Sequence, residues 1–304
     1  MNGILLIDKP ESWTSNDVVQ KLRGILREKR IGHAGTLDPM ATGLLTVFVG
    51  RATRAVEFAE GDRKRYLAGL RLGLTTDTQD ITGEVLGQCE AGISREALEE
   101  ALQAFRGEIR QTPPMYSAVK VNGRRLYELA RKGETVERKE REITVYSLEI
   151  LEQNGEDWLL DVSCSKGTYV RTLCHDIGEA LGCGGCLSSL RRTEAGLFSV
   201  ENAHTVDAVA VSAAAGLADA LLLPTDSLFQ EHPAVTLGER TRRASETAAF
   251  SVWTVRTAFT ACTAAAASFW RWPGSPAAPA ARSRAFLRYD RHGSGKTGRG
   301  PRLF

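Results

Sequence analysis

Short apolar runs separated by polar, glycine-containing segments dominate the first half of the chain. The run at residues 4–7 predicts a buried strand. Apolar residues then recur at helical spacing from Val18 to Leu26, after Ser15, which is a favourable N-cap residue. The same criteria predict a strand at 44–49, a short helix at 51–59, a strand at 65–72 and a polar turn region at 75–83.

The second half continues as a mixture of helices and strands without a regular βαβ repeat. A capping serine and helical apolar spacing predict a helix at 94–105. Two adjacent prolines make residues 112–117 an extended linker. Paired strands are predicted at 142–151 and 158–164, and a helix at 169–181. This order of elements predicts an α+β fold with helices and loops flanking a mixed sheet.

The segment Gly32–Gly43 is the most informative part of the chain for chemistry. Glycine, proline and threonine punctuate it, so it is predicted to be a loop, and apolar runs flank it. Asp38 precedes Pro39, which holds the aspartate backbone extended. The segment therefore offers a rigid way to present one carboxylate, although an ordinary Asp-Pro turn has the same composition.

Charge and cysteine usage narrow the class of protein. No apolar run approaches the roughly 18 residues that span a bilayer, and we expect a cytoplasmic protein without membrane contact. The cysteines are scattered, which disfavours a disulfide framework. Cys183 and Cys186 have metal-ligand spacing, but a second pair is missing, so a glycine-rich turn with small buried thiols is favoured and no metal is expected.

Several segments together resemble the TruB family of pseudouridine synthases. The loop Gly32–Gly43 is similar to the signature loop of that family. The other matching segments run in the family's order: Asn2–Pro10, Trp13–Ser15, Lys64–Tyr66, Leu72–Gly73, Thr75–Asp77, Thr82–Gly83, Pro113–Gly123, Cys164–Thr172 and Leu190–Thr193. Their number makes the resemblance specific where any one motif would be weak.

The resemblance implies a pseudouridine-synthase fold, with a mainly antiparallel sheet, and isomerisation of uridine 55 in the T-loop of tRNA. Base flipping precedes rearrangement of the glycosidic bond, and the reaction requires no cofactor. Asp38 is the implied catalytic carboxylate. It either attacks the sugar or assists an elimination from the ribose, and the sequence does not choose between these mechanisms.

The resemblance also assigns substrate-binding residues. Tyr66 is expected to pack on the target base, and Arg171 to pair with Asp38 and lower its pKa. Tyr169 lines the same pocket, and His33 contacts RNA near the flipped nucleotide. Lys9 and Leu190 complete the implied set.

Flipping a uridine out of a folded loop costs a few kcal/mol, so cationic side chains are expected to rim the site and bind phosphates. Acidic residues cluster near 77–108 and 149–161, and we expect these segments to lie away from RNA. The candidate phosphate contacts are Arg51, Arg54, Arg63, Lys64, Arg65, Lys120, Arg124, Arg125, Arg131, Lys132, Arg191 and Arg192.

The domain organisation is predicted from the same evidence. Residues 1–232 form the catalytic domain, with a T-loop-binding insertion around 108–140. Residues 233–304 contain 12 Lys and Arg against 3 Asp and Glu, and they lack the pattern of the small RNA-binding domain that usually ends the family. We favour a reading-frame shift near residue 243. The alternative is a genuine basic tail that binds RNA through arginine.

The expected partner is tRNA, bound by a monomer through its T-loop and stem, without an obligate protein partner. Two alternatives differ in a testable way. Guide-RNA-dependent relatives of the dyskerin type share the aspartate loop but work in multiprotein particles. A tRNA-folding factor would bind tRNA without needing Asp38. A metal-dependent hydrolase is disfavoured, since no His, Asp and Glu cluster is evident.

Overall fold

The computed structural model describes residues 1–59, 63–121, 123–230, 235–236 and 302–303. The chain divides into two compact units, Met1–Thr225 and Asp226–Phe304. In the second unit, β14 (Val235–Thr236) pairs with β15 (Arg302–Leu303) in an antiparallel manner. The predicted frame-shifted segment lies, apart from residues 302–303, outside the described residues. No helix among the described residues is long and apolar enough to cross a membrane.

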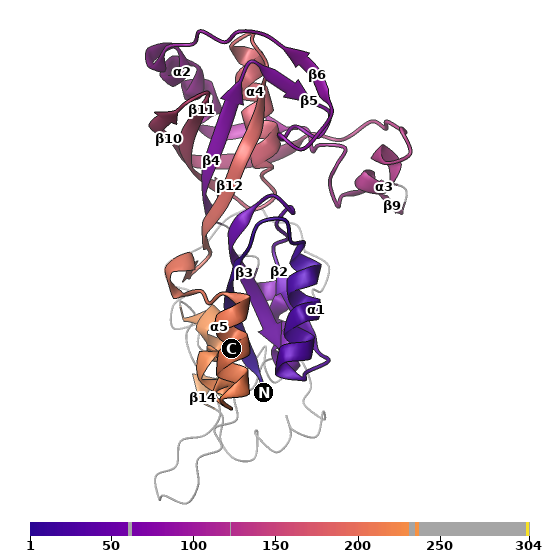
Figure 1. Cartoon of the computed structure of the whole chain (residues 1–304), viewed down its shortest axis with the longest axis vertical. Helices are drawn as coiled ribbons and strands as arrows, with labels where there is room; N and C mark the ends of the chain where they lie inside the picture. Colours follow the sequence, from indigo (N-terminus) through magenta and orange to yellow (C-terminus); the bar gives the residue numbers. More distant parts are fainter. Residues whose placement is uncertain (60–62, 122, 231–234, 237–301, 304) are drawn as a thin grey trace, which may run out of the picture. The chain divides into compact units, whose positions relative to one another are not determined.

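The first unit is built on one mixed sheet, with the strand order β1-β3-β12-β4-β11-β10-β7 in the described part of the chain (Figure 1). β2 is added beside β3, and β13 beside β12. Among the pairings between these strands, that of β12 with β3 is parallel and the others are antiparallel. The strands are β1 (Gly3–Lys9), β2 (Ile31–Ala34), β3 (Thr42–Val49), β4 (Arg63–Leu72), β7 (Gly107–Gln111), β10 (Arg141–Asn154), β11 (Asp157–Ser165), β12 (Gly185–Ala195) and β13 (Phe198–Ser199).

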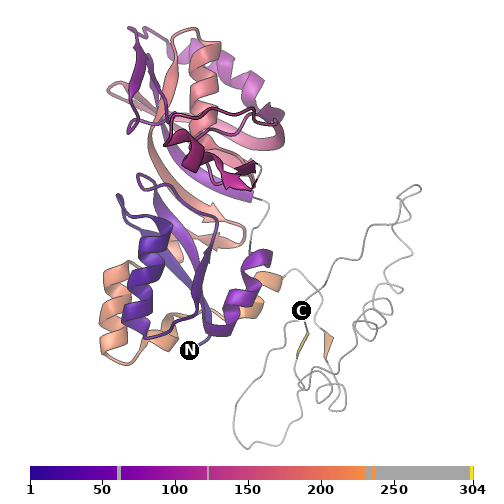
Figure 2. The same ribbon diagram turned by 90° about the vertical axis from the view of Figure 1, so that its right-hand side faces the viewer.

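One core lies where α1 (Ser15–Leu26) and α5 (Val206–Ala214) pack side by side against β1 and β3 (Figures 1 and 2). The apolar stripe of α1, including Val18 and Leu22, is fully buried there, as its helical spacing predicts. The N-cap is Thr14, which forms a capping box with Asp17. The prediction that Ser15 caps this helix is therefore wrong by one residue. The 3-10 helix η1 (Gly50–Phe58) follows β3.

A second core joins β4, β10, β11 and β12 to α2 (Arg95–Leu102) and α4 (Val170–Ala180). Leu148, Leu160 and Ile177 are completely buried in it. Ser94 caps α2, as predicted, and the 3-10 turn η2 (Gln103–Phe105) continues it. β5 (Leu74–Thr76) and β6 (Val85–Gln88) form a small hairpin, and the predicted polar turn region lies mostly between these two strands.

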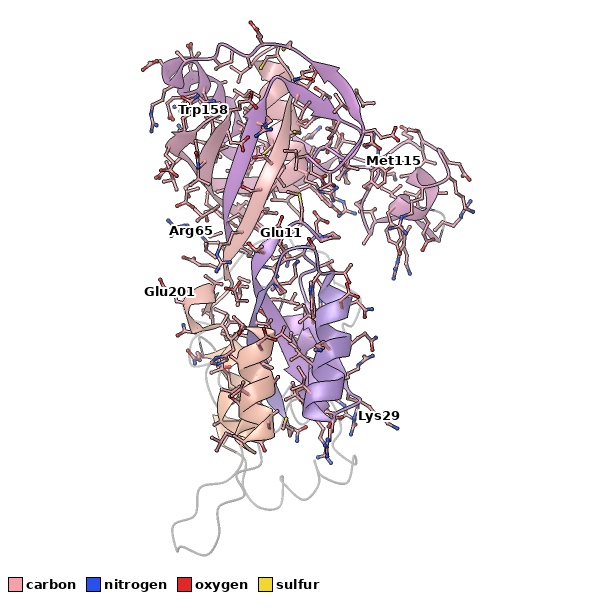
Figure 3. The ribbon with its side chains drawn as sticks, viewed as in Figure 1. Glu11, Lys29, Arg65, Met115, Trp158 and Glu201 are labelled. Carbon is pink, nitrogen blue, oxygen red and sulfur yellow. The ribbon has the colours of Figure 1, made fainter. Side chains whose placement is uncertain are left out.

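The segment after β7 leaves the body and returns as β10. It carries the short hairpin β8 (Lys120–Val121) and β9 (Arg124–Arg125) and the helix α3 (Leu126–Ala130). This segment projects to one side of the body in Figure 1, and Met115 lies near its base in Figure 3. The predicted insertion around 108–140 coincides with it in sequence.

The structure departs from the predicted elements in two places that matter for the site. Residues 32–34 of the expected loop belong to β2, so the free loop is shorter, from Gly35 to Ala41. β12, a central strand, was not predicted as an element at all. The chain after it continues through 3-10 turns η3 (Val200–Asn202), η4 (Ala218–Leu221) and η5 (Thr225–Phe229).

Candidate active site

The loop that carries Asp38 lies between the two cores and is fastened on both sides of the aspartate. Leu37, its predecessor, donates its backbone N–H to Ser15 Oγ at 2.9 Å and accepts from the same hydroxyl at 3.2 Å. Ala41 N donates to the Asp38 carbonyl at 3.1 Å, which closes a tight turn. Leu37 and Ala41 are buried in the second core. The backbone of Asp38 is thus fixed at several points.

Lys9, at the end of β1, is hydrogen-bonded to the loop. Its side chain is completely buried, and its ammonium donates to three carbonyls: Pro10 at 2.8 Å, Trp13 at 2.6 Å and Pro39 at 3.1 Å. Burial lowers the pKa of Lys9 to about 8. Because all three donors of the ammonium have acceptors, this geometry suits anchoring of the loop.

Asp38 faces Arg171 in a two-point contact. Arg171 Nε lies 2.9 Å from Asp38 Oδ2, and Nη2 donates to Oδ1 at 3.3 Å. The Arg171 side chain is 7% exposed, whereas that of Asp38 is 36% exposed. The carboxylate is thus held on its inner side and open on its outer side, which leaves it accessible to a ligand.

The net effect of this setting on the pKa of Asp38 differs from the prediction. Burial raises the pKa of the carboxyl above its ordinary value, and this effect outweighs the lowering by Arg171. The nearby charge of Asp80 raises it further, and Lys9 lowers it. Arg171 lowers the pKa of Asp38, as predicted, but the effect of burial on that pKa is larger.

Arg171 itself is immobilised by a buried polar network that the sequence analysis missed. Its Nη1 donates to Thr78 O at 3.1 Å and lies 3.6 Å from Asp80 Oδ2, and its Nη2 donates to Tyr116 O at 2.8 Å. Asp80 Oδ1 accepts from the hydroxyls of Thr78 and Thr82 at 2.9 and 2.6 Å.

Asp80 is buried, and Asp77 accepts a hydrogen bond from the Tyr116 hydroxyl at 3.1 Å. The prediction that the acidic segment from residue 77 lies away from RNA stays a prediction, but these two acids belong to the network around Arg171. A signal was present, because Asp77 ends the matched segment Thr75–Asp77 and Asp80 lies between it and the matched segment Thr82–Gly83.

Tyr66 lies on β4, opposite Val162 of β11 and Arg192 of β12. The side chain is buried, and burial raises the pKa of the phenol; a hydrogen bond with Arg192 and the charge of that residue oppose the rise. Tyr66 belongs to the same buried cluster as Leu37, the residue before Asp38.

The remaining predicted residues surround this centre in different ways. His33 lies on β2 with Nδ1 buried and without a hydrogen-bond partner, and burial lowers its pKa. Tyr169 caps α4, and its backbone N and O both bond Gln111, at 2.8 and 3.0 Å. Leu190 on β12 is buried with Leu37 and Tyr66 in the second core.

Some of the candidate phosphate contacts are exposed to solvent, and some form ion pairs or hydrogen bonds within the protein. Arg65 binds Asp161 and Glu194, and Arg191 forms a two-point pair with Asp8 at 3.0 and 2.8 Å. Arg192 is 1% exposed, so its prediction as a phosphate contact is wrong. The candidates that the structure leaves exposed are Arg51, Arg54, Arg63, Arg65, Lys120, Arg124, Arg125, Arg131 and Lys132. Of these, Arg63 also donates to the Ser163 hydroxyl, and Arg124 pairs with Glu134.

Two cavities lie elsewhere in the first unit. One of about 600 Å³ is lined by residues of β7 and β10, and one of about 560 Å³ lies between α1 and α5. Neither is lined by Asp38, Tyr66 or Arg171. Within the described residues no group of three His, Cys, Asp or Glu is arranged to hold a metal ion. Cys183 lies on the turn from α4 into β12, as the glycine-rich spacing suggested, whereas the buried Cys186 belongs to β12 itself.

Comparison with known families matches this chain over most of the first unit. Residues 23–170 match the model of the TruB family pseudouridylate synthase N-terminal domain, and residues 171–230 match the tRNA pseudouridylate synthase B C-terminal domain. These matches contain every candidate site residue except Lys9. Residues 231–304 lie beyond them.

Curated relatives named tRNA pseudouridine synthase B extend this match. The protein of Azoarcus sp. is 48% identical over 237 residues, covering 78% of this chain and 79% of its own. That of Alkaliphilus oremlandii is 50% identical, covering 76% of each. That of Syntrophomonas wolfei is 47% identical, covering 82% of this chain and 88% of its own.

Solved structures give the same fold. A chain of a Cbf5–Nop10–Gar1 complex is 32% identical with a TM-score of 0.59, and the match covers 74% of this chain and 61% of that one. A chain of an H/ACA ribonucleoprotein bound to substrate RNA is 29% identical with a TM-score of 0.56. The matched models, the identities and the shared fold lead to one conclusion: the chain belongs to the TruB family of pseudouridylate synthases.

Proposed function

We propose that this protein isomerises uridine 55 in the T-loop of tRNA to pseudouridine, with Asp38 as its catalytic carboxylate. The observation that carries the proposal is the two-point contact of Asp38 with the buried Arg171 on a loop fastened by Ser15 and Lys9. The names of the curated relatives support the choice of tRNA as substrate.

The proposed reaction breaks the C1′–N1 bond of the nucleotide, turns the uracil and forms a C1′–C5 bond. C5 loses its proton and N1 gains one, so no net oxidation occurs and no cofactor is needed. Positive charge develops at the ribose when the glycosidic bond weakens. A fixed carboxylate beside the sugar stabilises that charge better than water does, because it needs no reorganisation.

Asp38 must be ionised for either proposed mechanism, attack at the sugar or assistance of an elimination. Arg171 favours the ionised form against the effect of burial, and its two-point contact holds the carboxylate in place. Tyr66 is proposed to contact the flipped uracil, together with Tyr169, His33 and Leu190. Lys9 is proposed to act through the Pro39 carbonyl, because its ammonium is fully engaged.

RNA binding is proposed for the exposed cations near the insertion. Arg125 and Arg131 stack on the ring of Tyr127 at 5.7 and 5.5 Å, which arranges a cationic surface on α3. Such a surface offsets the unstacking of the target base by phosphate contacts. We propose that a monomer in the cytoplasm binds the T-loop and stem without an obligate protein partner.

A guide-RNA-dependent particle is the competing proposal, because the solved relatives include chains of complexes with Nop10. Identity is higher to the stand-alone tRNA synthases, at 47–50%, than to these chains, at 28–32%. Activity of the purified protein on bare tRNA, without a guide, separates the two.

The test uses a tRNA transcript labelled with tritium at C5 of uridine. The wild-type protein is expected to release tritium, because C5 loses its hydrogen. Asp38→Asn is expected to release none while it binds the transcript with unchanged affinity. Release by Asp38→Asn at the wild-type rate removes Asp38 from the mechanism. Binding without release by the wild type favours a folding factor instead.

A further inference from the structure

Arg192 is a fully buried cation at the centre of the sheet. It lies on β12, opposite Tyr66 of β4 on one side and Gly43 of β3 on the other. A buried guanidinium is costly unless its donors are satisfied, so its partners indicate what it holds in place.

Two hydrogen-bond partners of Arg192 bracket the aspartate loop. Arg192 Nε donates to Leu44 O at 2.7 Å, and Nη2 donates to Gly35 O at 2.9 Å. These carbonyls lie on either side of Asp38 in the chain. The planar fork of the guanidinium sets the spacing of two carbonyls more rigidly than a single ammonium does.

The backbone fits closely around this arginine. A Cβ at Gly43 would lie 2.3 Å from Arg192 O, and a Cβ at Gly35 would lie 3.2 Å from Arg192 Nη1. Both glycines have positive φ, 95° and 66°. The loop backbone therefore approaches Arg192 to a degree that only glycine permits at Gly43.

The same arginine lies beside Tyr66. The two residues are directly opposite each other in the pairing of β12 with β4, and both side chains are buried. Arg192 thus adjoins both parts of the site that the proposed function needs: the loop of Asp38 through two carbonyls, and the tyrosine through the strand pairing.

We propose that Arg192 is a positioning residue that fixes the Asp38 loop and the Tyr66 hydroxyl relative to each other. The inference rests on the proposed function for its effect on turnover, but its structural content does not depend on the substrate. It assigns to Arg192 an indirect role through Asp38 and Tyr66, in place of contact with RNA phosphates.

The test compares the full-length Arg192→Gln and Arg192→Lys variants with Arg106→Gln. Arg106 is the matched control, because it also binds a backbone carbonyl, Leu148 O, at 3.0 and 2.6 Å, but belongs to the α2–β10 region. Folded fraction, kcat and KM for tRNA are measured for each variant. A misplacement of reacting groups by about 1 Å costs roughly 100-fold in rate.

Arg192→Gln is expected to lose about 100-fold in kcat per folded molecule, with KM changed less than about 3-fold. Arg192→Lys is expected to fold and to recover part of that loss, because one ammonium replaces the charge but cannot span both carbonyls. Arg106→Gln is expected to keep wild-type kcat. Wild-type kcat in Arg192→Lys, or losses that only follow the folded fraction, overturn the proposal.

A second readout does not need turnover. Ultraviolet titration of the phenol, assigned by difference from Tyr66→Phe, is expected to move to higher pH in Arg192→Lys, since a hydrogen-bond donor is lost. An unchanged titration overturns the contact with Tyr66. An inactive wild type in which this shift is present sinks the proposed function and leaves the positioning role standing.

Discussion

At the scale of single residues, burial and charge oppose each other at Asp38. The carboxyl loses water on its inner side, which raises its pKa, and Arg171 compensates only in part. Asp80 adds to the rise while it holds Arg171 in place. The site therefore keeps a carboxylate that protonates more readily than an exposed aspartate.

This balance predicts the acid side of the pH profile. The folded-state pKa of Asp38 is raised, so the carboxylate gains its proton, and activity falls, at a higher pH than for an ordinary aspartate. By the same sign, its ionised form opposes folding at neutral pH, and that effect disappears as the pH falls through the raised pKa. Single-turnover rates measured across a range of pH locate this acid limb of the pH–rate profile.

Asp80→Asn provides the matched comparison. Removal of its charge is expected to move the acid limb to lower pH, because Asp80 raises the pKa of Asp38. An acid limb that stays in place, or moves to higher pH, contradicts the assignment of that limb to Asp38.

Lys9 supplies a stability prediction. Lys9→Met leaves three carbonyls without their donor and is expected to destabilise the fold by about 1–3 kcal/mol. Lys21→Met, at an exposed position of α1, is expected to change stability by less than about 0.5 kcal/mol. Chemical denaturation measures both, and equal effects contradict the anchoring role.

Sequence reasoning identified Asp38, Arg171 and Tyr66 through motifs, and the structure brings these three together. It named Lys9 but not its contacts, and it missed Asp80, because both act by burial and burial is a property of the folded chain. Arg192 shows the same limit. An arginine in an Arg-Arg pair was interpreted as a surface cation, yet it is among the most buried side chains.

At the scale of elements, the start of α1 links helix stability to the site. Thr14 caps the helix, whereas Ser15 binds the loop at Leu37. Thr14→Ala is expected to cost about 1 kcal/mol of stability and to leave kcat unchanged. Ser15→Ala is expected to lower kcat more than its loss of stability explains. Chemical denaturation and steady-state rates distinguish the two variants. A loss of kcat in Thr14→Ala but not in Ser15→Ala contradicts the role of Ser15 in holding the loop.

Two glycines on neighbouring elements test the close approach of β3 to β12. Gly43→Ala combines a positive φ with a contact of 2.3 Å to Arg192 O, and we expect a loss of several kcal/mol or failure to fold. Gly24→Ala in α1 meets no atom within 4 Å and is expected to stabilise by about 0.5–1 kcal/mol. Thermal unfolding measures both changes.

The helices and strands that were predicted from apolar spacing agree with the structure within a few residues at their ends, but others, including β7 and α5, did not follow from that spacing. β12 did not, because its apolar positions are few and it contains a buried arginine and two serines. A central strand that includes polar residues next to the candidate site lacks the apolar pattern by which strands are predicted. β2 was not predicted either, because it has only four residues and runs directly into a glycine-rich loop.

At the scale of the whole molecule, the two cores are formed by residues before 220, and the site lies between them. Truncation after residue 230 is therefore expected to leave the midpoint of unfolding of the first unit unchanged and kcat within about 3-fold of wild type. A basic tail that binds RNA predicts a higher KM for tRNA. A truncated chain that fails to fold contradicts the independence of the first unit.

The origin of residues 244–304 is open to a direct check on the gene. The frame-shift hypothesis predicts that an alternative frame near residue 243 encodes an uninterrupted continuation with the composition of a folded domain. Early stop codons in that frame would leave the basic tail as the interpretation of the 12 Lys and Arg in residues 233–304.

The central claim is that Asp38 on its fastened loop converts one uridine of tRNA into pseudouridine. The most direct measurement is mass-spectrometric mapping of a tRNA transcript treated with the purified protein, after derivatisation that adds mass only to pseudouridine. We predict one modified site, at uridine 55 of the T-loop, with the wild type and none with Asp38→Asn. An unmodified transcript with the wild type, or the same product with Asp38→Asn, contradicts the account.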